Sequence, residues 1–257
     1  MKSKSLSKSK RKIKVIKSSS EEHYREGQDM ECVYDSIPVE FKEVQIHYDE
    51  EQFTHLKLPM RAMIVGPSSA GKTQTLCLLM KYMHHPFSKI YLYIKDPEEQ
   101  LYKCFISKIH ELEKENHTKI LTVETDLSKT VKYDDLDKRE NNLIVIDDMM
   151  CGSPKDLQKV NQLFIMGRKK NASVIFLIQL FFIKALMTAR QNLSTLILKG
   201  NITPLNLRNI LRAYCDDEEE VQKYYKLYRK ITKEKVNNFM TIRIGDTTKY
   251  HITKNLG

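Results

Sequence analysis

The sequence predicts an α/β fold in which a central, mostly parallel sheet is flanked by helices. Short apolar runs of strand length alternate with longer segments whose apolar residues recur at helical spacing. Glycine, proline and aspartate residues separate these segments, as expected of the loops in such a fold. Two of the most apolar runs end directly in polar side chains, at the position where open α/β sheets bind ligands.

The clearest transition from strand to helix lies in residues 61–75, which read RAMIVGPSSAGKTQT. Residues 62–65 are an apolar run suited to a buried strand, and a helical pattern opens at Lys72. The residues between them fit the phosphate-binding motif G-x-x-x-x-G-K-[ST]. A chance match in an ordinary turn is disfavoured because the flanking strand and helix patterns accompany the motif. We therefore expect a nucleotide to contact Gly66, Pro67, Ser68, Ser69, Ala70, Gly71, Lys72, Thr73 and Gln74.

This motif predicts a P-loop NTPase that binds ATP together with Mg²⁺. The glycines allow backbone N–H groups to turn towards phosphate oxygens at the positive end of the following helix. Lys72 is expected to reach the β- and γ-phosphates as a catalytic residue, and the hydroxyl of Thr73 is expected to bind Mg²⁺.

A second apolar strand, residues 143–146, leads directly into Asp147 and Asp148. Asp147 is expected to hold the water shell of Mg²⁺, and Asp148 to orient the attacking water or accept its proton. A strand that simply ends in two capping acids is the alternative, and the accompanying P-loop disfavours it. Residues 173–178 form another strand that ends in Gln179, a candidate catalytic residue that could contact both the γ-phosphate and the attacking water.

The remaining segments complete the expected order of elements. Further strands are expected at residues 44–48, 89–94, 120–123 and 196–198, with a C-terminal hairpin at 239–244 and 249–252. Helices are expected at residues 72–83, 101–115, 156–170, 205–214 and 218–231, and a polar surface excursion at 127–142. We divide the chain into a disordered basic tail (1–29), a lead-in segment (30–57), an ATPase core (58–200) and C-terminal helices with a hairpin packed on the core (201–257).

The composition indicates a folded intracellular protein with a basic tail. The net charge is +10, and eight basic residues without any acid lie within residues 1–20. Such a tail could bind DNA phosphates, serve as a nuclear-import signal or aid solubility. The five scattered cysteines form no C-x-x-C pair, which argues against disulfides and zinc and favours a reducing compartment. The most apolar run, residues 172–187, is interrupted by Gln179 and Lys184 and is shorter than the ~20 residues of a membrane helix, so we expect no membrane partner.

The order of these motifs resembles the FtsK/HerA superfamily of DNA-pumping ATPases. The likeness is greatest to the genome-packaging ATPases of poxviruses and other large DNA viruses, virophages and Polinton-type transposons. It covers roughly residues 58–199 and rests on the P-loop (66–73), the acidic strand end (146–148), Gly167-Arg168, residues 176–179 and the Arg-x-Asn at 190–192. Two positions depart from the pattern: Lys169 stands where such ATPases often carry His, and Asp148 stands where DNA pumps usually carry Glu.

The resemblance implies a RecA-like core that assembles into a homo-oligomeric ring, either a pentamer or a hexamer. ATP hydrolysis would drive double-stranded DNA into a capsid, with capsid or portal proteins as further partners. The resemblance also implies a catalytic arginine finger that acts on the ATP of the neighbouring subunit, for which Arg168 is the best match and Arg190 the rival. The protein would act in the host cytoplasm or nucleus, or in association with the virion.

The main alternative to a DNA translocase is a P-loop phosphotransferase, such as a nucleoside or nucleotide kinase. A P-loop nucleoside or nucleotide kinase would not need the second acid, Asp148, and the chain lacks a compact arginine-rich lid. A GTPase is disfavoured because neither D-x-x-G after the acidic strand nor N-K-x-D occurs. A non-catalytic nucleotide-binding protein is disfavoured by the intact set of Lys72, Thr73, Asp147 and Asp148.

Overall fold

The computed structural model describes residues 56, 58–82, 87–149, 152–234, 238–245 and 249–253. The chain divides into two units, residues 1–43 and 44–257, and every described residue belongs to the second unit. The expected basic tail (1–29) and lead-in strand (44–48) lie outside the described residues.

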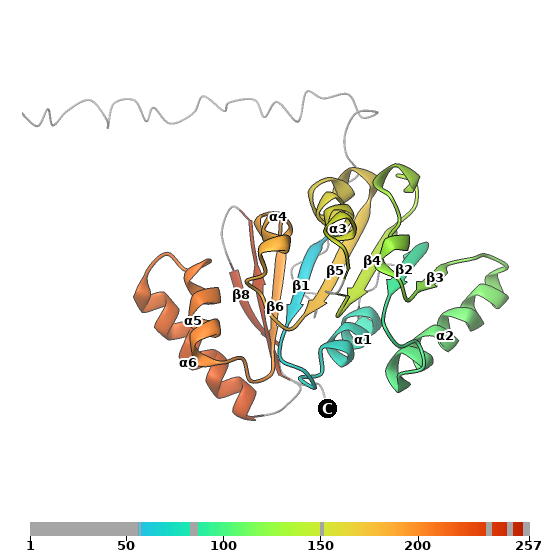
Figure 1. The fold of residues 1–257 in the computed structure, drawn as a ribbon. Coiled ribbons are helices and arrows are strands. Elements are labelled where there is room, and N and C mark those ends of the chain that lie inside the picture. Colours follow the sequence, from blue (N-terminus) through green and yellow to red (C-terminus); the bar gives the residue numbers. More distant parts are fainter. Residues whose placement is uncertain are drawn as a thin grey trace, which may run out of the picture. The chain divides into compact units, whose positions relative to one another are not determined.

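The described residues form one eight-stranded sheet with helices on both faces (Figure 1). In spatial order its strands are β3 (Leu121–Glu124), β2 (Lys89–Tyr93), β4 (Asn142–Asp147), β5 (Ala172–Ile178), β1 (Arg61–Val65), β6 (Thr195–Lys199), β7 (Phe239–Arg243) and β8 (Lys249–Thr253). The first six strands in this order are parallel, and β7 and β8 continue the sheet as an antiparallel hairpin. The predicted α/β fold with a mostly parallel sheet is therefore confirmed.

Six α-helices within the described ranges cover the two faces of this sheet. The helices are α1 (Lys72–Tyr82), α2 (Gln100–Asn116), α3 (Pro154–Met166), α4 (Met187–Gln191), α5 (Pro204–Arg212) and α6 (Glu218–Glu234). Apolar residues of α1 and α2 join one buried cluster, and those of α3 to α6 join the other. None of the helices in these ranges combines the length and the apolarity needed to cross a membrane.

The central strands β1, β4 and β5 consist mainly of apolar residues because helices cover them on both faces. All seven residues of β5 are buried. Val174, Phe176 and Ile178 contribute to the cluster under α3 to α6. Ile175 and Leu177 point to the opposite face and contribute to the cluster under α1 and α2. This alternation holds the carboxyl end of β5 in a fixed position in the middle of the sheet.

Two expected segments differ from the structure in detail. The helix expected at 156–170 begins earlier, where Ser153 and Asp156 form a capping box, and its α-helical part ends at Met166. Residues Gly167–Lys170 form a separate 3₁₀ turn that ends at Asn171 in the left-handed conformation. The segment 127–142 is not wholly a surface excursion, because Leu127 and Leu136 are buried under α3.

Candidate nucleotide-binding site

Strand order brings the sequence motifs to one edge of the sheet. The P-loop follows β1, Asp147 and Asp148 lie at the end of β4, and Gln179 follows β5. Because β5 lies between β4 and β1 and all three are parallel, their carboxyl ends meet. This is the edge at which parallel α/β sheets bind ligands.

The P-loop passes so close to β6 that its first glycine is required. Any other residue at Gly66 would place its Cβ 2.4 Å from the carbonyl oxygen of Lys199. Ser69 and Gly71 both have positive φ angles, 59° and 82°, which curl the loop back towards the start of α1. The backbone N–H of Gly66 donates to the carbonyl of Ile178 at 3.2 Å, which ties the loop to the end of β5.

The side chain of Lys72 folds back onto the start of the P-loop. Its Nζ donates to the carbonyl oxygens of Gly66 at 3.1 Å and Pro67 at 3.0 Å. Burial lowers the pKa of Lys72, and the nearby charges of Asp147 and Asp148 oppose that shift. An ammonium group carries three donors, so this side chain sits at the loop with the chemistry needed to bind phosphate oxygens.

Thr73, Asp147 and Tyr102 form the part of the site that suits a metal ion. The hydroxyl of Thr73 donates to Oδ2 of Asp147 at 3.2 Å, and the phenol of Tyr102 donates to the same oxygen at 2.5 Å. Burial raises the pKa of Asp147, while the two hydroxyl donors and the charge of Lys72 lower it. Neutral and anionic oxygens are the ligands that Mg²⁺ prefers, and substrate phosphates and water usually complete its shell. The residues present therefore fit Mg²⁺.

Asp148 faces a different environment from Asp147. Its backbone is left-handed, with φ of 50°, and its N–H donates to the carbonyl of Leu177 at 3.2 Å. Oδ2 of Asp148 accepts a hydrogen bond from Nε2 of Gln179 at 3.2 Å and faces Nζ of Lys95 at 3.4 Å. The structure thus brings two candidate catalytic residues, Asp148 and Gln179, into contact beside the P-loop.

The two candidate arginine fingers occupy opposite edges of the sheet. Arg168 is exposed in the turn before β5. It lies near Arg61, the first residue of β1. The pKa of Arg61 is lowered mainly by burial and further by the positive charge of Arg168. The seven residues of β5 then separate Arg168 from the site by about 20 Å, at a rise of ~3.3 Å per residue. Arg168 therefore lies at the edge opposite the P-loop of its own chain.

Arg190 is engaged by the loop that follows β5. Its Nη1 donates to the carbonyl oxygens of Phe181 at 3.0 Å and of Ile183 at a shorter distance. The guanidinium also lies over the rings of Phe181 and Phe182, at 5.5 and 5.6 Å from their centroids. These contacts stabilise the loop after Gln179, which is a structural role within the same chain.

Three residues at the site carry no signal in the sequence. Tyr102 and Lys95 follow β2, and Lys199 ends β6 beside the P-loop. Each lies far from the motifs along the chain and reaches the site only through the strand order. The spacing rules that identify a P-loop therefore could not have found them.

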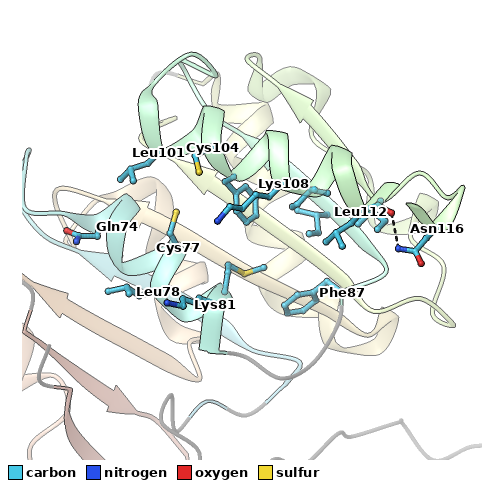
Figure 2. Close-up of a pocket in the computed structure, with 15 residues that line it drawn as sticks. Gln74, Cys77, Leu78, Lys81, Phe87, Leu101, Cys104, Lys108, Leu112 and Asn116 are labelled. Atoms are coloured by element: carbon cyan, nitrogen blue, oxygen red, sulfur yellow. Dashed lines mark hydrogen bonds between the residues drawn. The ribbon is translucent and has the colours of Figure 1, made fainter. Parts of the chain in front are cut away.

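A separate apolar groove of about 850 Å³ lies between α1 and α2 (Figure 2). Gln74 lines one end of it, and Cys77 of α1 and Cys104 of α2 line it from opposite sides. Most of its other lining residues are apolar, including Leu78, Phe87, Phe105 and Ile109. Two lysines, Lys81 and Lys108, also line this groove, which is a distinct feature of this face.

Together the parallel sheet, the P-loop and the acidic end of β4 define a P-loop ATPase. Comparison with known families agrees with this class. The chain belongs to the family described as Poxvirus A32 protein, whose family model matches residues 43–237. No curated protein matches the sequence significantly.

Solved structures with a similar fold include two of B204 from Sulfolobus viruses. One is described as the DNA-packaging ATPase from Sulfolobus turreted icosahedral virus, with a TM-score of 0.52 and 14% identity over 78% of this chain and 99% of that chain. Another is the genome packaging NTPase B204 from Sulfolobus turreted icosahedral virus 2 in complex with AMPPCP, with a TM-score of 0.51 and 14% identity over 77% of this chain and 99% of that chain. At this level of identity the likeness supports the fold.

Proposed function

We propose that this protein is an ATP-driven translocase that moves double-stranded DNA into a viral or virus-like capsid. Membership of the A32 family supports this proposal, as does the fold shared with the DNA-packaging ATPase B204. The observation that carries it is the position of Arg168, at the edge of the sheet opposite the P-loop of its own chain. A finger in that position can complete only the site of a neighbouring subunit, as a ring motor requires.

Within one site, the residues divide into phosphate-binding and water-activating groups. Lys72 and the N–H groups of the P-loop bind the phosphates of ATP, and Thr73 and Asp147 hold Mg²⁺. When bound, Mg²⁺ neutralises the charge that develops on the phosphate oxygens. Asp148 accepts the proton of the attacking water, and Gln179, hydrogen bonded to Asp148, orients that carboxylate.

The assembled form is a homo-oligomeric ring in which each Arg168 acts on the ATP of the next subunit. The basic tail, residues 1–29, adds eight positive charges near its start that can pair with DNA phosphates. Capsid or portal proteins are the expected partners, and a reducing compartment of the host, cytoplasm or nucleus, or the virion is the expected location.

The test is ATP hydrolysis measured with and without double-stranded DNA. We expect DNA to stimulate turnover strongly, and Lys72→Ala to abolish hydrolysis under both conditions because the phosphates lose the motif lysine. Indifference to DNA, together with phosphoryl transfer to a nucleoside or nucleotide, would instead establish the kinase. Hydrolysis without stimulation, by a protein that remains monomeric with ATP and DNA, would refute the ring motor.

A further inference from the structure

The turn after β6 packs directly against the P-loop. We call residues 199–202 the support turn; it connects Lys199, the last residue of β6, with the start of α5. The carbonyl oxygen of Lys199 lies only 2.4 Å from the position that a Cβ at Gly66 would occupy. Cε of Lys199 lies 3.5 Å from where a Cβ at Gly71 would be. One buried residue therefore lines both glycines of the phosphate-binding motif.

Gly200 extends this contact to the middle of the P-loop. It has a φ of 74°, and a Cβ added there would lie 2.6 Å from Cβ of Ala70. Any other residue would be strained in this backbone conformation and would also push Ala70 outwards. The support turn and the P-loop therefore fit together without room for an added methyl group, so a shift of one displaces the other.

Helix α6 holds the support turn in place. The phenol of Tyr228 donates to the carbonyl oxygen of Gly200 at 2.7 Å. The guanidinium of Arg229 donates to Oδ1 of Asn201 at 2.5 Å and to the carbonyl of Ile202 at 2.8 Å. Tyr228 is completely buried, and burial raises its pKa, so its phenol remains a hydrogen-bond donor at neutral pH.

We propose that Tyr228 is a positioning residue that, through the support turn, sets the affinity of the P-loop for nucleotide phosphates. The inference rests on the proposed function only in taking the P-loop as the ATP site. Its physical basis is preorganisation: a loop held in its binding conformation binds more tightly because less ordering is needed when the ligand arrives. The C-terminal helix α6, which carries no nucleotide-binding motif, thus becomes part of the binding machinery.

The experiment compares Tyr228→Phe with Tyr224→Phe in the full chain. Tyr228→Phe removes the hydroxyl that reaches Gly200 and keeps the buried ring. Tyr224 lies on the same helix and stacks on Tyr250 of β8 at 3.6 Å between ring centroids, so Tyr224→Phe also keeps its ring contact. The measurements are the affinity for a non-hydrolysable ATP analogue, KM and kcat for ATP, and hydrogen exchange of residues 66–73.

For Tyr228→Phe we expect about 3- to 10-fold weaker binding, the range for loss of one buried hydrogen bond. KM for ATP should rise while kcat changes little, and the P-loop amides should exchange faster in the absence of nucleotide. Tyr224→Phe should match the wild-type protein in all three measurements.

Wild-type affinity and P-loop exchange in Tyr228→Phe would overturn the inference. An equal loss in Tyr224→Phe would also overturn it, because the effect would then be general to α6. Failure of the proposed function has a different signature: DNA would not stimulate the wild-type ATPase, whatever the ratio of affinities between the two variants. A wild-type protein that binds no ATP analogue would refute the assignment of the P-loop, and this inference with it.

Discussion

Tyr102→Phe removes the hydrogen bond from α2 to the carboxylate that is expected to hold Mg²⁺. The phenol donates to Oδ2 of Asp147 at 2.5 Å, a short distance typical of a hydroxyl bonded to a carboxylate. A hydrogen bond to a charged group contributes about 1.5–3 kcal/mol, which corresponds to roughly a 10- to 150-fold change in an equilibrium constant. Loss of such outer-shell partners typically lowers metal affinity by about 10- to 100-fold. We therefore expect Tyr102→Phe to need at least about 10-fold more Mg²⁺ for half-maximal ATPase activity.

The pH dependence of Tyr102→Phe should change in a definite direction. Burial raises the pKa of Asp147, and the hydrogen bond from Tyr102 is the largest of the interactions that lower it again. Without that bond the carboxylate takes up a proton at a higher pH, so the acid limb of the activity profile should move to higher pH. The neutral acid is a poorer metal ligand, so the Mg²⁺ requirement should increase as the pH falls.

The assay combines two titrations. Mg²⁺ is titrated against ATPase activity at saturating ATP, and Mn²⁺ binding is measured directly by electron paramagnetic resonance with a non-hydrolysable ATP analogue. Tyr93→Phe is the matched control. Tyr93 is a buried tyrosine on β2, and its hydroxyl accepts a hydrogen bond from the N–H of Val131 instead of contacting Asp147. If Tyr102→Phe binds Mn²⁺ as tightly as the wild-type and control proteins, the assigned role of Tyr102 is wrong.

Two further predictions concern the residues expected to act in hydrolysis. Asp148→Asn should bind ATP normally but trap it, because an amide cannot accept the proton of water; normal turnover would refute that role. Arg168→Ala should lose about 10³–10⁵ in kcat, and mixing it with Lys72→Ala should restore some activity, since a neighbour's intact Arg168 can complete an intact Lys72 site. No recovery in the mixture would contradict action between subunits.

Glu113→Gln should lower stability at pH 7, and its difference from the wild-type protein should shrink in acid. The carboxylate accepts the N–H groups of Leu121 and Ile120, each at 2.7 Å, and these bonds with His110 hold its pKa at about 2. Because this pKa is below the ordinary value of 4.5, its stabilisation is complete above about pH 4.5 and is lost as the pH falls through about 2. Urea unfolding at pH 7, 4 and 3 measures the trend.

Asp147 and Asp148 show how adjacent residues acquire different chemistry. The side chain of Asp147 turns inwards to Thr73 and Tyr102, where burial is the main influence on its pKa. Asp148 has a left-handed backbone and meets Gln179 and Lys95 instead. Asp is among the residues that tolerate this conformation, so the short acid at position 148 suits the turn that it occupies.

The sequence by itself determined the class of fold and the motifs that lie on single elements. The apolar runs of β1, β4 and β5 are recognisable because strands covered on both faces need apolar residues throughout. The P-loop is recognisable because its turn needs Gly66 and Gly71, and because binding of nucleotide phosphates needs a lysine at position 72. These requirements act over a few consecutive residues, so spacing alone records them.

The tertiary structure alone decided which distant residues meet these motifs. Tyr102, Tyr228 and the support turn come from elements that no local pattern links to the P-loop. The same holds for the two arginines: Arg190 is bound by the loop after β5, while Arg168 lies at the opposite edge of the sheet. Such contacts depend on strand order and register, which arise from packing of the whole domain and leave no periodic trace in the sequence around any one residue.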